Sequence, residues 1–147
     1  MSVINDDYFH AIQTKIATYH GVKMQGVVEA PYHQVHNRAA LIFTLEVILE
    51  AHREKFATVS NPLRGKTALE HLLLVKYKWP ISEIRSLNLQ DALLALQEEL
   101  SFEKLPECAQ DVIKGFGAFN TKQFFPQVVA DEWDPELYLT IPKQQIW

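Results

Sequence analysis

Cysteine is nearly absent from this sequence, since Cys108 is the only one among 147 residues. A lone cysteine excludes an internal disulfide, and with 48% hydrophobic residues the chain can bury a core without one. No apolar run approaches the roughly 18 residues of a membrane span, and residues 1–21 contain neither a basic leader nor a continuous apolar stretch. We therefore expect a soluble, cytoplasmic protein with no membrane partner.

Glycine and C-terminal basic residues are also scarce. The five glycines form neither a phosphate-binding loop nor the sharp turn that carries a nucleophilic serine. Residues 86–147 hold four Lys/Arg and ten Asp/Glu, whereas residues 1–85 hold ten and eight. This imbalance argues against a general nucleic-acid binder and is compatible with a basic protein partner, although acidic residues that only solvate the surface would give the same composition.

Hydrophobic residues recur at three- and four-residue steps along most of the chain, which is the spacing of amphipathic helices. One segment, starting between Pro31 and Asn37 and ending near Thr58, is apolar over a wide stripe and should lie deep in the fold. The other predicted helices cover residues 6–20, 67–78, 81–87, 89–100 and 106–115. We predict a mainly α fold, in which residues 1–147 form a single domain built as a bundle of about five helices.

Several helix ends follow from capping residues. Asn5 or Asp6 can cap the first helix, and Asn88 with Asp91 can cap the helix over residues 89–100. Thr67 followed by Glu70 predicts a capping box, in which each side chain satisfies a free backbone N–H. Pro80 should end the preceding helix near residue 78.

The final 32 residues lose the helical periodicity and contain seven of the sixteen aromatic residues. Within them, residues 137–141 (LYLTI) alternate like one short strand. Residues 22–30 form either another strand or an irregular connector. We expect an irregular aromatic segment wrapped over the bundle, with at most one or two short strands.

The stretch HLLLVKYKWPISEIRSLNLQDALLAL, residues 71–96, looks like a helix-turn-helix. A DNA-recognition helix needs Lys and Arg to neutralise phosphates. The second helix of this stretch, LQDALLALQEEL, has three acidic residues and no basic one. The pattern therefore indicates a packed helical hairpin, and we expect no nucleic-acid partner.

Few residues could bind a metal or act as a nucleophile. His33 and His36 stand one helical turn apart, but a zinc site needs three or four ligands and no third ligand has an established spacing. The simpler interpretation is that these two histidines are polar residues at the start of a helix. Cys108 follows a predicted helix start, but no histidine is near it in the sequence. We therefore expect this lone cysteine to be a small core residue. We expect no metal and no cofactor.

An enzymatic alternative starts from RGKTALEH. Arg64, six intervening residues and His71 resemble the signature of the HEPN ribonucleases, which are also helical bundles. The resemblance implies that His71 would act as acid or base and that Arg64 would stabilise a phosphate. Gly65 stands where that family usually has a polar residue, and the predicted cap at Thr67 would place Arg64 outside the helix. The structural alternative is a half-buried His71 and an Arg64 on a loop.

Acidic and aromatic residues cluster in the C-terminal half. The predicted partner-binding surface consists of Asp131, Glu132, Trp133, Asp134 and Glu136 together with Glu98, Glu99 and Glu103. Aromatic anchors ringed by charge are typical of protein interfaces, because the ring supplies buried area and the charges steer the encounter. Alternatively, Trp133 and its neighbours form a lid over one end of the bundle, with the acids in water. The sequence leaves both interpretations open.

In size, charge and lack of a catalytic motif, the chain resembles bacterial immunity proteins of the contact-dependent inhibition and colicin systems. These proteins share no fold or signature, so the resemblance assigns no residue. It implies a non-enzymatic inhibitor whose carboxylates cover the basic cleft of a toxin domain, most simply a nuclease. A third hypothesis is a structural protein that self-associates through its aromatic C-terminal segment.

Overall fold

The computed structural model describes residues 3–22, 30–119 and 124–140. Within these ranges the protein is mainly helical and has no strand, which confirms the predicted fold class. Its α-helices are α1 (Asp6–His20), α2 (Ala30–Phe56), α3 (Lys66–Tyr77), α4 (Ile81–Ser86), α5 (Leu89–Ala95) and α6 (Glu107–Gly115). Its 3-10 helices are η1 (Phe102–Lys104), η2 (Ala130–Glu132) and η3 (Leu137–Thr140).

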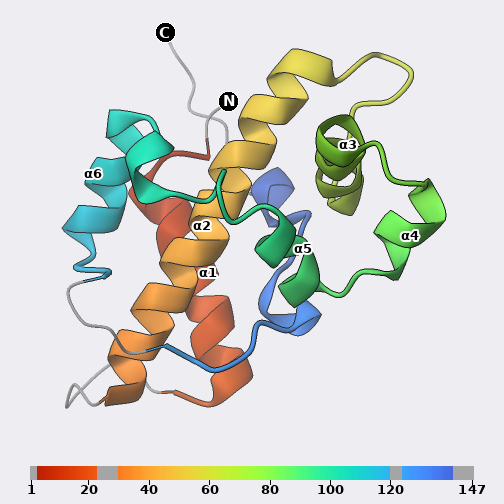
Figure 1. Ribbon diagram of the computed structural model, residues 1–147. Coiled ribbons are helices and arrows are strands. Elements are labelled where there is room, and N and C mark those ends of the chain that lie inside the picture. Colours follow the sequence, from red (N-terminus) through yellow and green to blue (C-terminus); the bar gives the residue numbers. More distant parts are fainter. Residues whose placement is uncertain (1–2, 23–29, 120–123, 141–147) are drawn as a thin grey trace, which may run out of the picture.

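α2 is the central helix. It packs against α1, α3 and α6, and in Figure 1 it runs between α6 on one side and α3, α4 and α5 on the other. Its fully buried residues include Val35, Ala39, Phe43, Leu45 and Leu49. Because these residues face several directions around the helix, α2 is enclosed by its neighbours, as the wide apolar stripe predicts.

The boundaries of α1 and α2 depend mainly on local signals. The Asn5 side chain accepts a hydrogen bond from the backbone N–H of Tyr8 (2.7 Å), so of the two predicted candidates Asn5, and not Asp6, is the cap. Gly21 ends α1 in the left-handed conformation, with φ of 67°. α2 begins at Ala30, one residue before the predicted window, and ends at Phe56. Most of the possible strand at residues 22–30 lies outside the described residues.

The predicted capping box at Thr67 is wrong. α3 starts at Lys66 after Gly65, which has φ of 62° and ψ of −135° and makes no side-chain cap. Arg53 of α2 fixes this entry by donating to the carbonyls of Leu63 (2.9 Å) and Gly65 (3.3 Å). A tertiary contact therefore sets the helix start in place of a local one. At the other end, the prediction from Pro80 is confirmed, since α3 ends at Tyr77.

α5 is shorter than predicted. The Asn88 cap is confirmed, because its side chain accepts from the N–H of Asp91 (2.8 Å). The helix, however, ends at Ala95, and turns replace its predicted last residues, 96–100. Carboxylates at a helix C-terminus oppose the helix dipole, which is consistent with an end before Glu98 and Glu99. Leu96 remains fully buried where the chain turns.

The C-terminal segment 124–140 contains no strand. The predicted strand at residues 137–141 is wrong for the residues described there, because Leu137–Thr140 form η3. Tyr138 is buried and stacks under the Arg53 guanidinium, which lies 4.1 Å from its ring centroid. This cation–π contact and the Tyr138 hydroxyl, 3.4 Å from the Gly65 nitrogen, attach η3 to the α2–α3 connection. Among the described residues, no helix is both long and apolar enough to cross a membrane.

Candidate partner-binding site

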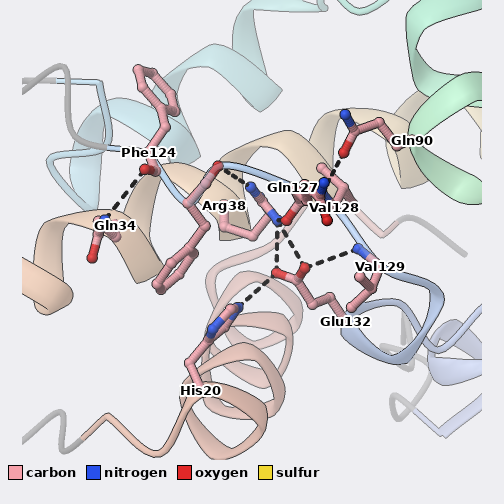
Figure 2. Close-up of polar contacts among 10 residues, drawn as sticks. His20, Gln34, Arg38, Gln90, Phe124, Gln127, Val128, Val129 and Glu132 are labelled. Atoms are coloured by element: carbon pink, nitrogen blue, oxygen red, sulfur yellow. Dashed lines mark hydrogen bonds and ion pairs between the residues drawn. The ribbon is translucent and has the colours of Figure 1, made fainter.

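The C-terminal segment lies across the helices as an extended chain whose backbone is bonded by side chains (Figure 2). Arg38 of α2 donates to the carbonyls of Phe125 and Gln127, both at 2.8 Å. On the α5 side, Val128 N–H donates to the Gln90 side chain (2.9 Å). Backbone groups that no strand or helix satisfies thus find partners on α2 and α5. The segment is held in one position even though it has little regular structure.

A buried ion pair anchors η2 to the core. Arg38 Nη1 lies 2.8 Å from both carboxylate oxygens of Glu132, and the two side chains are 4% and 0% exposed. His20 Nε2 of α1 lies 3.0 Å from Glu132 Oε2, and the His20 ring stacks on Phe125 at 3.6 Å between centroids. The Val129 N–H is a further donor to the carboxylate. Burial lowers the pKa of Arg38, while the Glu132 carboxylate opposes this shift.

Trp133 is anchored beside this ion pair. It is 7% exposed, and its Nε1–H donates to Glu46 Oε1 of α2 at 2.5 Å. Burial raises the pKa of Glu46 to about 7, against the hydrogen bond from Trp133. Glu132 and Trp133 were expected on an exposed partner-binding surface, but the structure uses both inside the molecule. The lid interpretation describes these two side chains better.

The other predicted carboxylates lie at or near the surface. Asp131 and Glu136 are exposed, and Asp134 is half-buried, with an oxygen 3.9 Å from Lys15 Nζ. In the second group, Glu98 pairs with Lys104 (3.4 Å) and Glu99 with Lys76 of α3. Glu103 is exposed and accepts from the Ser101 hydroxyl. The two groups therefore have different neighbours: the first adjoins α1 and the α2–α3 connection, and the second adjoins the end of α3.

Most of the C-terminal acids have no ion-pair partner among the described residues. Of the ten Asp/Glu in residues 86–147, four pair with basic side chains in the described structure: Glu98, Glu99, Glu132 and Asp134. The other six are exposed and have no salt-bridge partner among the described residues: Asp91, Glu103, Glu107, Asp111, Asp131 and Glu136. Unpaired surface carboxylates create a negative potential that extends about 8 to 10 Å into physiological salt.

A cavity of about 460 Å³ opens between the C-terminal segment and α3, α4 and α5. Its apolar walls include Leu69 and Leu73 of α3, Ile84 of α4, Leu89 of α5, and Val128 and Trp133. Its polar lining includes Lys66, Glu70, Asn88 and Asp91. A pocket of this size with apolar walls and a few polar groups is typical of a binding site. Trp133 is one of the lining residues, and because it is buried it does not project as an anchor.

The groups of the enzymatic hypothesis lie elsewhere. His71 Nδ1 is 2.7 Å from Nε2 of His52, and the His71 ring packs against Phe56. The pKa of His52 is lowered to about 4, mainly by burial and further by the neighbouring His71. Arg64 is exposed and precedes α3, as predicted, so it does not share a helix with His71. Neither Arg64 nor His71 lines the cavity.

The described residues offer little for metal chemistry. They contain no group of three or more His, Cys, Asp or Glu side chains that could hold an ion. His36 is buried on α2, and its ring lies within hydrogen-bond distance of the Gln13 amide (3.0 Å). Cys108 is exposed on α6, so it is not the core residue that the sequence suggests.

Sequence reasoning missed the residues that position this site, namely His20, Arg38 and Glu46. Arg38 and Glu46 stand among apolar residues of the central helix, and a charge on a buried stripe needs a buried partner. Asking which distant residue supplies that partner would have pointed to the acids and tryptophan of the C-terminal segment. For His20, at the end of α1, the sequence carries no comparable signal.

Comparisons of the chain with protein-family models, with curated proteins and with solved structures found no match.

Proposed function

We propose that this protein is a non-enzymatic inhibitor of the immunity type, which binds a basic toxin domain through the acidic surface of its C-terminal half. The observation that carries the proposal is the set of six exposed carboxylates in residues 86–147 that have no salt-bridge partner in the described structure. Their negative potential attracts a cleft that evolved to bind phosphates, and no bond-making chemistry is needed. We assign the contact to the two carboxylates on the C-terminal segment, Asp131 and Glu136.

The anchoring of η2 supports the same function. Asp131 lies directly beside Glu132, and Glu136 follows Trp133 by three residues, so both carboxylates stand on a segment fixed from inside. Binding groups held in advance lose less conformational entropy when a partner docks. Glu132 and Trp133 therefore serve binding indirectly, by positioning their neighbours.

Co-expression with the toxin domain encoded by the adjacent open reading frame tests the proposal. The native chain should restore growth, and the double reversal Asp131→Lys/Glu136→Lys should abolish both rescue and capture of the purified domain. Glu54→Lys is the matched control, because Glu54 is an exposed acid at the end of α2, outside both predicted acidic groups. Unchanged capture by the double variant would contradict the proposed surface.

A direct assay separates this function from the ribonuclease alternative. Purified protein incubated with RNA should leave it intact. RNA cleavage that disappears in His71→Ala, with unchanged circular dichroism, would replace the inhibitor proposal by the enzymatic one.

A further inference from the structure

The cavity beside Trp133 has an apolar interior that is already formed. α3, α4 and α5 contribute leucine and isoleucine side chains, and the C-terminal segment closes the remaining side with Val128 and Trp133. Trp133 cannot swing away freely, because Glu46 holds its indole nitrogen and the preceding residue, Glu132, is bonded to Arg38. The cavity volume of about 460 Å³ falls within the roughly 300 to 1,000 Å³ of typical ligand pockets. Such an interior selects an aromatic or branched aliphatic group.

Two of the charged residues that line this cavity are acidic, Glu70 and Asp91, against Lys66. Asp91 is exposed at the start of α5 and has no salt-bridge partner among the described residues. Glu70 lies 3.5 Å from Arg85, and Lys66 is the one basic residue of the lining within the described part of the chain. Asp131 directly follows the lining residue Ala130, and Glu136 directly follows the lining residue Pro135. A cationic group next to the apolar one would be favoured here.

The neutral polar groups of the lining are largely occupied by the fold. Asn88 caps α5, and Gln90 accepts the Val128 N–H. Their side-chain oxygens are therefore already engaged by the fold, and we take shape and charge as the main basis of selection.

We propose that the cavity receives one aromatic or branched aliphatic side chain of the partner, flanked in the partner's sequence by Lys or Arg. This inference rests on the proposed function and names the chemistry of the contact. The inserted side chain would be the central buried anchor of the interface, and the surrounding carboxylates would pair with the flanking cations.

Short peptides test the inference without the toxin. The probes are Ac-Lys-Phe-Lys-NH₂, its acidic counterpart Ac-Glu-Phe-Glu-NH₂ and the truncated Ac-Lys-Ala-Lys-NH₂, titrated into the full chain and followed through the Trp133 indole N–H resonance. Only the first should shift this resonance in a saturable way. Equal binding of all three, or preference for the acidic peptide, would overturn the inference.

Two variants locate the binding. Ala92→Leu places a larger side chain in the cavity, since Ala92 is buried in its lining, and should abolish peptide binding. Asp91→Lys alters only an exposed side chain and should weaken binding by about fivefold or more. This second variant keeps the test valid if the first fails to fold. Peptide binding that is unchanged in Asp91→Lys would contradict the role of the rim charges.

The cavity and the proposed function can fail separately. If no peptide binds but Asp131→Lys/Glu136→Lys still abolishes toxin capture, the inhibitor function stands and the cavity is not the contact site. If the basic aromatic peptide binds in the cavity while the toxin domain is never captured, the inhibitor function fails and the recognition chemistry of the cavity stands.

Discussion

Removing the Arg38 side chain should strongly destabilise the protein. Arg38→Met keeps a similar apolar volume but deletes the bonds to Glu132 and to the carbonyls of Phe125 and Gln127. It leaves a fully buried carboxylate with only His20 and one backbone N–H as donors among the described residues. Breaking a buried pair by removing one partner costs about 3 to 5 kcal/mol. That is a large fraction of the roughly 5 to 15 kcal/mol by which a domain is stable.

Urea denaturation followed by circular dichroism and tryptophan fluorescence measures this loss. With a slope of about 2 kcal/mol per molar urea, the midpoint should fall by about 2 M. Lys104→Met removes an exposed pair and serves as the control, with an expected loss below about 1 kcal/mol. Adding Glu132→Gln to Arg38→Met should recover part of the stability, because it removes the uncompensated buried charge.

The same variant should also release the C-terminal segment. Chymotrypsin should cleave after Phe124 faster in Arg38→Met than in the native chain at equal fractions folded, whereas Pro126 protects the bond after Phe125 in both. A loss of stability below about 1 kcal/mol, together with unchanged proteolysis, would refute the conclusion that the Arg38–Glu132 pair anchors the segment.

Three further predictions concern pH and backbone geometry. Burial raises the pKa of Glu46 to about 7, so between pH 4.5 and 7 the folded state retains a proton that the unfolded state releases. The free energy of unfolding should therefore fall by roughly 3 kcal/mol as pH rises from about 4.5 to 7. Glu46→Gln should abolish this slope in urea titrations, and a persisting slope would assign it to another group. The pKa of His52 is lowered to about 4, so stability should be lost as pH falls from about 6.5 to 4, and His52→Gln should flatten only this acid limb. Gly65→Ala should lower the free energy of unfolding by about 1 to 3 kcal/mol in thermal unfolding, because φ is +62° and the new Cβ would lie 3.2 Å from Glu136 Cγ. The matched control is Gly115→Ala, whose new Cβ meets no atom within 4 Å. This control should be neutral or stabilising.

Most of the helical framework could be predicted from the sequence because its signals are local. The Asn5 and Asn88 side chains cap α1 and α5 through bonds to N–H groups three residues away. Pro80 limits α3 by its effect on the residue before it. The deep position of α2 follows from apolar residues on several of its faces. These determinants act within a turn or two of helix, so they can be found by looking along the chain.

The candidate site could be predicted only in part. The exposed carboxylates Asp131 and Glu136 and the acidic composition were visible in the sequence. The cavity was not, because its walls come from three helices and a distant segment that meet only after folding. The start of α3 was also misplaced, since Arg53, more than ten residues earlier, fixes it.

Thus the sequence by itself determined a helical chain with an excess of C-terminal carboxylates, through periodicity, capping and charge. Only the tertiary structure decided which of those carboxylates face the solvent. Glu132 and Asp131 are adjacent and chemically alike, yet one is buried and the other exposed. The physical reason is that a carboxylate can leave water only when distant donors replace its hydration, and Arg38 and His20 supply them from 94 and 112 residues away.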